Sequence, residues 1–97
     1  MKDFYLYILK CADGSFYTGH TDDLEKRIAE HQEGKIQCFT MAKLPVLLVY
    51  QANFVTREEA ISAERQIKGW RRAKKQALIN KNWDLLRILA KTSQSDK

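Results

Sequence analysis

The chain has 97 residues, the size of one domain, because a single globular core usually takes about 100–150 residues. Hydrophobic residues make up 44% of it and aromatic residues 10%, which excludes two independent cores and a chain disordered by composition. No apolar run approaches the roughly 20 residues that span a bilayer, and the first residues lack a signal-peptide pattern. We therefore expect a cytoplasmic protein with no membrane contact, comprising one domain over residues 1–91 and a frayed polar tail over 92–97.

The two cysteines do not indicate a metal centre or a redox motif. Cys11 and Cys38 lie 27 positions apart, with neither CxxC spacing nor the spacing of a zinc site. We expect both to be reduced thiols, as is usual inside cells.

Charge is distributed unevenly along the sequence. The chain carries 17 basic and 12 acidic residues, a formal net charge of +5. Residues 65–83 contain seven basic residues and no acidic one, so the rest of the chain, with ten basic and twelve acidic residues, has a net charge of −2. A block of one sign is typical of a surface that faces a polyanion, although a solvated helix face has the same composition. The residues that we expect to contact nucleic acid are Lys68, Arg71, Arg72, Lys74 and Lys75.

The first half of the chain predicts two strands, a helix and a third strand. Residues 4–11 and 16–20 are rich in aromatic and branched residues. A helix follows, with Thr21 or Asp22 as its cap, Leu24 and Ile28 facing inward, and Gly34 at its end. Residues 35–45 show no strong period and predict a loop. The almost continuous apolar run 46–50 predicts a strand covered on both faces.

The second half predicts helices. Thr56 and Glu59 form a capping-box pattern that opens a helix ending near Gly69. A basic helix is expected over residues 72–80 and a short fourth helix over 83–89. This order of elements predicts an α+β domain with a small, largely antiparallel sheet.

The turn between the first two strands decides which side chains share a face of the sheet. A two-residue turn over Asp13 and Gly14 would place Tyr7 and Tyr17 on opposite faces. A three-residue turn, with Gly14 left-handed as a bulge, would pair Cys11 with Ser15 and put both tyrosines on one face. The sequence alone allows both turns.

Several polar residues fall on the inward-facing stripe of a predicted helix, where the pattern calls for apolar residues. Glu64 lies among Ala60, Ala63 and Ile67, where a carboxylate is disfavoured unless it forms an ion pair or binds a cation. Arg27 and His31 lie on or beside the inward stripe of the first helix. Each residue has an ordinary structural interpretation: an ion-pair partner, an interior histidine, or, for the tyrosines, core packing. Together with the basic segment, they have the composition of a metal-dependent phosphodiester site.

The order of these motifs resembles the GIY-YIG endonuclease superfamily, in particular its small stand-alone bacterial proteins. Residues 5–9 read YLYIL and 17–19 read YTG, followed by TDDLEKRI at 21–28 and ERQIK at 64–68. The similarity covers about residues 4–86. It implies a three-stranded antiparallel sheet flanked by three or four helices, with the site on one face and the bulged form of the turn.

By position, the resemblance implies a role for each of five residues. Tyr7 and Tyr17 match the two motif tyrosines, either of which would be the general base, with Tyr7 preferred. Arg27 matches the phosphate-contacting arginine, His31 a supporting position, and Glu64 the single metal-binding glutamate. One Mg²⁺ or Mn²⁺ ion is implied, because no second acid lies on the stripe of Glu64.

The sequence departs from the family pattern at a few positions. The first motif begins with Tyr5 and Leu6, Thr18 replaces isoleucine in the second, and His20 follows the glycine where several nucleases have lysine. We expect a metal-dependent endonuclease that cuts DNA, with branched or damaged DNA as its candidate substrates. A non-catalytic nucleic-acid-binding module is the alternative, and a protein-interaction domain is a weaker third. The sequence does not distinguish DNA from RNA, nor does it indicate an oligomeric state.

Overall fold

The computed structural model describes residues 3–34 and 43–92. By their internal contacts the residues form two compact units, Met1–Glu64 and Arg65–Lys97. The first contains β1 (Phe4–Lys10), β2 (Phe16–Thr21), α1 (Leu24–Gln32), β3 (Leu47–Phe54) and most of α2 (Arg57–Lys68). The second contains the end of α2, α3 (Arg72–Ile79) and α4 (Trp83–Thr92). The fold is α+β, as predicted. The predicted loop lies mostly at residues 35–42, outside the described residues.

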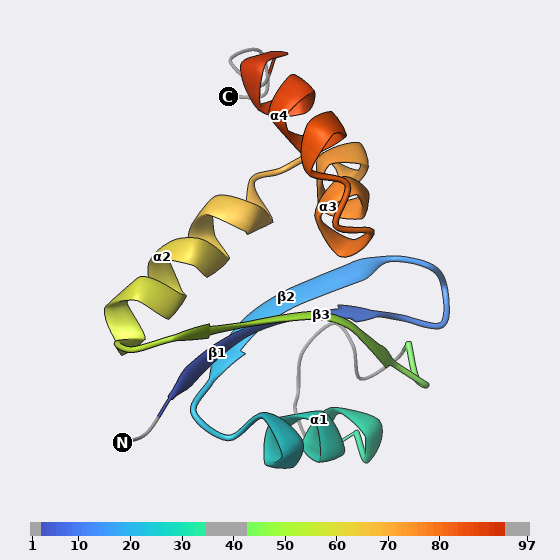
Figure 1. Ribbon diagram of the computed structural model, residues 1–97. Helices are drawn as coiled ribbons and strands as arrows, with labels where there is room; N and C mark the ends of the chain where they lie inside the picture. Colours follow the sequence, from blue (N-terminus) through green and yellow to red (C-terminus); the bar gives the residue numbers. More distant parts are fainter. Residues whose placement is uncertain (1–2, 35–42, 93–97) are drawn as a thin grey trace. The chain divides into compact units, whose positions relative to one another are not determined.

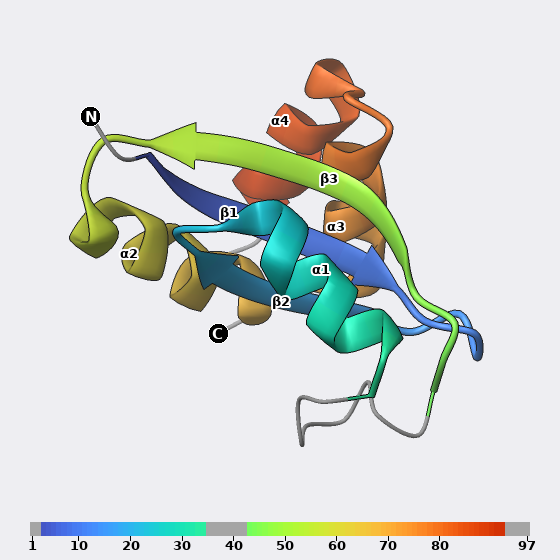
Figure 2. The same ribbon diagram turned by 90° about the horizontal axis from the view of Figure 1, so that it is seen from below.

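The first unit is a three-stranded antiparallel sheet in the order β2-β1-β3. Helix α1 covers one face and the part of α2 up to Glu64 covers the other (Figures 1 and 2). Because β1 is the central strand, both of its faces are buried. Tyr7 and Leu9 form a core with Cys11 and Val46 on one face, whereas Leu6 and Ile8 fill the other. This alternation positions Tyr7 beneath α1.

The hairpin between β1 and β2 has the bulged three-residue turn. The backbone N–H of Cys11 donates to the carbonyl of Ser15 at 2.8 Å, and Gly14 has a φ of +88°. Leu9 therefore pairs with Tyr17 and Tyr7 with Gly19. The Asp13 side chain accepts hydrogen bonds from the backbone and hydroxyl of Ser15, which lower the pKa of Asp13 to about 2. The prediction that Tyr7 and Tyr17 share one face is confirmed.

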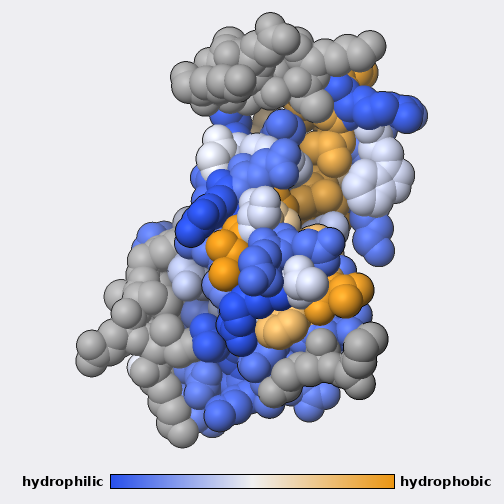
Figure 3. All heavy atoms as spheres, turned by 90° about the vertical axis from the view of Figure 1, so that its left-hand side faces the viewer, coloured by the Kyte–Doolittle hydropathy of each residue, from blue (hydrophilic) through white to orange (hydrophobic). Residues whose placement is uncertain are grey.

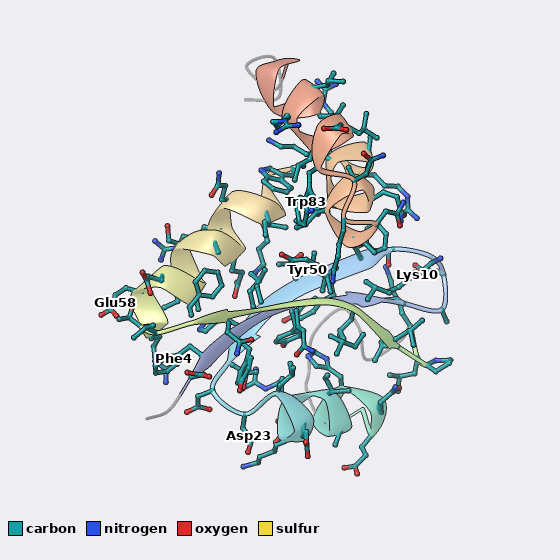
Figure 4. The ribbon with its side chains drawn as sticks, viewed as in Figure 1. Phe4, Lys10, Asp23, Tyr50, Glu58 and Trp83 are labelled. Carbon is teal, nitrogen blue, oxygen red and sulfur yellow. The ribbon has the colours of Figure 1, made fainter. Side chains whose placement is uncertain are left out.

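The predicted cap of α1 was wrong. The N-cap is Asp23, whose side chain accepts the backbone N–H of Lys26, whereas Thr21 is the last residue of β2. Asp23 marks the start of α1 in Figure 4, and side chains fill the space between this helix and the sheet. Leu24 and Ile28 pack against the core as predicted. The Thr56–Glu59 capping box at the start of α2 is also confirmed, with both reciprocal hydrogen bonds formed.

The prediction that residues 46–50 are covered on both faces was also wrong. Val46 is buried, but β3 begins at Leu47, which is 63% exposed, and the strand lies at the sheet edge. An edge strand has a neighbour on one side only, so its apolar residues are covered incompletely. Gln32 at the end of α1 fixes the approach to β3, because its side-chain amide exchanges two hydrogen bonds with the backbone of Val46.

In the second unit, α3 and α4 form a helical pair joined by a short turn. Ala77 and Leu78 of α3 are buried, while Trp83, Leu85 and Ile88 of α4 remain exposed. Apolar atoms accordingly gather in the upper part of Figure 3, at the height of α3 and α4. None of the helices in the described part of the chain has the length and apolar character needed to cross a bilayer.

The positive φ at Gly14 predicts that replacing this glycine lowers the stability of the protein through backbone strain alone. A Cβ atom at Gly14 would meet nothing within 4 Å, so Gly14→Ala adds only the strain of an L residue with positive φ. We expect a loss of about 1–2 kcal/mol in unfolding free energy, measured by urea titration. Gly69→Ala is the control, because Gly69 lacks a positive φ and its Cβ would make an ordinary contact at 3.6 Å. A Gly14→Ala protein as stable as the parent would contradict the strained turn.

Candidate active site

Two tyrosines and a histidine cluster beneath α1. The ring centroids of Tyr7 and Tyr17 are 6.3 Å apart, and the His31 ring stands edge-on to both at 5.8 and 5.1 Å. The Tyr7 hydroxyl and His31 Nε2 are hydrogen-bonded at 3.1 Å. Tyr7 and His31 are buried, whereas Tyr17 is half-buried. Three of the five predicted site residues are thus in direct proximity.

Gly19 permits this arrangement because the Tyr7 ring crosses it. A Cβ atom at Gly19 would lie 2.6 Å from the Tyr7 hydroxyl and 2.8 Å from Cζ, closer than side chains approach one another. Tyr7 and Gly19 are paired across β1 and β2, so the ring reaches over the backbone of the edge strand. The glycine of the second motif therefore has a steric function.

Burial determines where the protons of this cluster reside. Desolvation raises the pKa of Tyr7 well above its usual value; the charges of Tyr17 and Glu64 act in the same direction, and the Arg27 guanidinium opposes them. Burial also lowers the pKa of His31, as does the nearby Arg27. Near neutral pH, Tyr7 therefore keeps its proton and His31 is neutral, so the hydrogen bond between them joins two uncharged groups. This environment disfavours the phenolate form of Tyr7, which a general base would need.

Arg27 reaches the cluster from α1. Its charge and a hydrogen bond both act on Tyr7, which places the guanidinium beside the phenol. Its Nε atom also lies 3.4 Å from Glu30 Oε1, and the side chain is 39% exposed. On its solvent side, Arg27 lines an open cleft of about 370 Å³, in which acidic residues outnumber basic ones. This excess of acidic residues disfavours the cleft as a phosphate site.

Glu64 approaches the cluster from α2, on the opposite face of the sheet. Its Oε1 atom lies 2.5 Å from Nδ1 of His20, and its side chain is 15% exposed. The carboxylate is also close enough to Tyr7 for its charge to disfavour ionisation of the phenol. The sequence predicts an ion pair as the structural alternative to a metal, and the structure shows Glu64 in contact with His20.

The residues of the basic segment differ in accessibility. Lys68, Arg71 and Arg72 are exposed, whereas Lys75 is half-buried and burial lowers the pKa of its ammonium group. Lys74 is only 8% exposed and stacks on the Trp70 ring, with Nζ 4.3 Å from the centroid. The exposed cations are therefore the better candidates for phosphate contact.

The sequence did not single out His20 as a site residue. Its alternation places His20 on the face opposite Tyr7 and Gly19, and no spacing rule relates it to a residue 44 positions away. The only signal was its position directly after the motif glycine. Only the packing of α2 against the sheet brings it to Glu64.

The donors near Glu64 fit one oxygen-seeking cation with few protein ligands. In the part of the chain that the structure describes, no group of three or more His, Cys, Asp or Glu side chains could hold a metal ion. Mg²⁺ typically keeps several water ligands and takes one or two protein carboxylates together with substrate phosphate. A single glutamate fits this coordination chemistry.

Comparison with known proteins identifies the family to which the chain belongs. The model of the GIY-YIG catalytic domain matches residues 3–77. Similar proteins include a UPF0213 protein of Staphylococcus saprophyticus, 48% identical over 82% of this chain and 98% of that one, and a UPF0213 protein of Streptococcus pneumoniae serotype 4, 44% identical over 82% and 81%. The chain therefore belongs to the GIY-YIG catalytic domain family.

Its solved relatives include members of the UPF0213 group. The solution structure of the UPF0213 protein BH0048 from Bacillus halodurans is 41% identical, with a TM-score of 0.54 over 80% of this chain and 83% of that one. The protein EF2693 from Enterococcus faecalis is 37% identical, with a TM-score of 0.59 over 88% and 90%. These structures share the α+β fold described above.

The depressed pKa of His31 predicts acid sensitivity. Because the folded protein disfavours the charged imidazole, the unfolded chain binds this proton more readily below the ordinary pKa of about 6.5. The stability that neutral His31 contributes is complete above pH 6.5 and is lost as pH falls through its folded pKa. Urea unfolding at pH 7.5, 6.5 and 5.5 should show this decline, and His31→Gln should reduce it. An equally steep decline in His31→Gln would contradict the assignment.

Proposed function

We propose that this protein is a divalent-metal-dependent endonuclease that hydrolyses phosphodiester bonds in DNA, with Glu64 holding one Mg²⁺ or Mn²⁺ ion. The observation that supports it best is the convergence of Tyr7, Tyr17 and His31 in one cluster, with the charges of Arg27 and Glu64 acting on it. Arg27 offers a cation to a phosphate, and Glu64, whose charge acts on Tyr7 from the other face of the sheet, offers a carboxylate to an ion. Family membership is consistent with this function.

Each side chain then has a distinct task. The Arg27 guanidinium would neutralise the negative charge that grows on the phosphate as the water oxygen bonds to phosphorus and the P–O bond to the leaving oxygen breaks. The leaving oxygen then takes a proton from solvent. Tyr17, the more exposed phenol, orients the water and accepts its proton. Tyr7 keeps its own proton and, through its hydrogen bond to His31, fixes the wall of the site. A divalent ion on Glu64 would supply Lewis-acid polarisation of the phosphate and lower the pKa of bound water.

The second candidate, a nucleic-acid-binding module without catalysis, is favoured by one observation. The Glu64 carboxylate already contacts Nδ1 of His20 at 2.5 Å, as a carboxylate with a purely structural role would. Both candidates bind DNA, and only one of them cuts it. Incubation of the purified protein with nicked, branched and single-stranded DNA, with and without Mg²⁺ or Mn²⁺, distinguishes them.

The role of Glu64 is tested by Glu64→Gln, which keeps the shape of the side chain and removes its charge. We expect cleavage to fall by orders of magnitude while DNA binding persists, because the ion loses its protein ligand. The control is Glu58→Gln, an exposed glutamate on the same helix, which should cut at the parent rate. Thermal unfolding of both variants separates loss of the ion from loss of the His20 contact. A destabilised Glu64→Gln protein with parent cleavage would overturn the assignment.

The basic segment predicts salt-dependent binding with little sequence preference, because such contacts go to the phosphate backbone. Replacing the exposed Lys68, Arg71 and Arg72 together by Gln should flatten the plot of log K against log salt on duplex DNA. The slope should change by about 0.9 for each phosphate contact removed. Fluorescence anisotropy titrations at several salt concentrations measure it. Arg87→Gln, in α4 outside the segment, is the control; an unchanged slope in the triple variant would mean that this surface is merely solvated.

A further inference from the structure

His20 and Glu64 form a contact that the proposed chemistry does not yet use. His20 follows Gly19 in β2 and pairs with Leu6 of the central strand, so its backbone position is fixed by the sheet. Its Nδ1 atom lies 2.5 Å from Glu64 Oε1. The two side chains are 27% and 15% exposed. The contact therefore joins a rigid strand to the carboxylate proposed to hold the ion.

The hydrogen bond does not require a charged histidine. Nδ1 carries a proton in the imidazolium form and in one of the two neutral tautomers, and in either it donates to a carboxylate oxygen. A carboxylate has about four lone-pair directions, so this hydrogen bond is compatible with a cation on the same group. The contact restrains Glu64 without displacing an ion.

Restraint matters because the glutamate side chain is long. Its rotatable bonds allow many orientations, and a ligand that must be ordered on binding lowers the affinity for the ion. Carboxylates that ligate metals are themselves commonly hydrogen-bonded, and loss of such a partner typically costs 10–100-fold in affinity or activity. A site with a single protein carboxylate depends strongly on that one group.

We propose that His20 is a positioning residue whose Nδ1–H holds the Glu64 carboxylate in the orientation that binds the divalent ion. The inference rests on the proposed function, because it assigns the ion to Glu64. His20 does not contact the reacting atoms in this role. In this role His20, the residue of β2 that follows Gly19, supports the Glu64 carboxylate on α2.

A pair of variants of nearly equal shape tests the role. His20→Asn retains an N–H donor at the position of Nδ1, whereas His20→Leu has a similar outline and no donor. MgCl₂ alone is titrated into the full chain, and the amide resonances around Glu64 are followed by ¹H–¹⁵N NMR. We expect His20→Leu to weaken Mg²⁺ binding about 10–100-fold and His20→Asn to stay within a few-fold of the parent. Glu58→Gln, the exposed control, should bind like the parent.

Two results would overturn the positioning role: His20→Leu binding Mg²⁺ like the parent, or His20→Asn losing as much affinity as His20→Leu. The same spectra report whether each variant folds, and His20→Ala replaces His20→Leu if the latter does not. A parent protein with no Mg²⁺-dependent shift near Glu64 would instead refute the proposed metal site. Binding that Glu64→Gln abolishes and His20→Leu leaves intact would refute the positioning role alone.

Discussion

The close approach of the Tyr7 ring to the backbone of Gly19 is the constraint on which the candidate site depends. It requires the bulged turn at Gly14, because only that register places Gly19 opposite Tyr7. It also requires a residue without a side chain, since a Cβ atom would lie 2.6 Å from the hydroxyl. With the ring across the edge strand, its hydroxyl meets His31 and comes under the influence of the charges of Arg27 and Glu64.

Burial of this phenol has a consequence for chemistry. The central strand gives Tyr7 its rigid position, but the same burial raises its pKa and suits it to donating a hydrogen bond rather than accepting a proton. Tyr17, on the edge strand, is only half-buried. The two tyrosines of the motif pair thus differ in burial, because one lies on a central strand and the other on an edge strand.

The two compact units separate the chemistry from the basic charge. The phenol cluster and the carboxylate lie within Met1–Glu64, whereas the basic segment lies almost entirely within Arg65–Lys97. Within the second unit, Lys74 stacks on Trp70 and contributes to packing, while Lys68, Arg71 and Arg72 remain accessible to a phosphate backbone. Basic residues of one segment therefore differ in their accessibility, because Lys74 packs on Trp70 and is buried whereas the other three are exposed.

The sequence by itself determined the α+β class, the order of the elements and the capping box at Thr56, because these depend on local periodicity and local hydrogen bonds. It also indicated Tyr7, Tyr17, Arg27, His31 and Glu64 as site residues, whose catalytic roles remain predictions. It did not determine the hairpin register, since both turns satisfy the same local pattern, nor the edge position of β3, which depends on strand order. The pairing of His20 with Glu64 was decided only by tertiary structure, because packing α2 on the sheet joins residues that no local spacing relates.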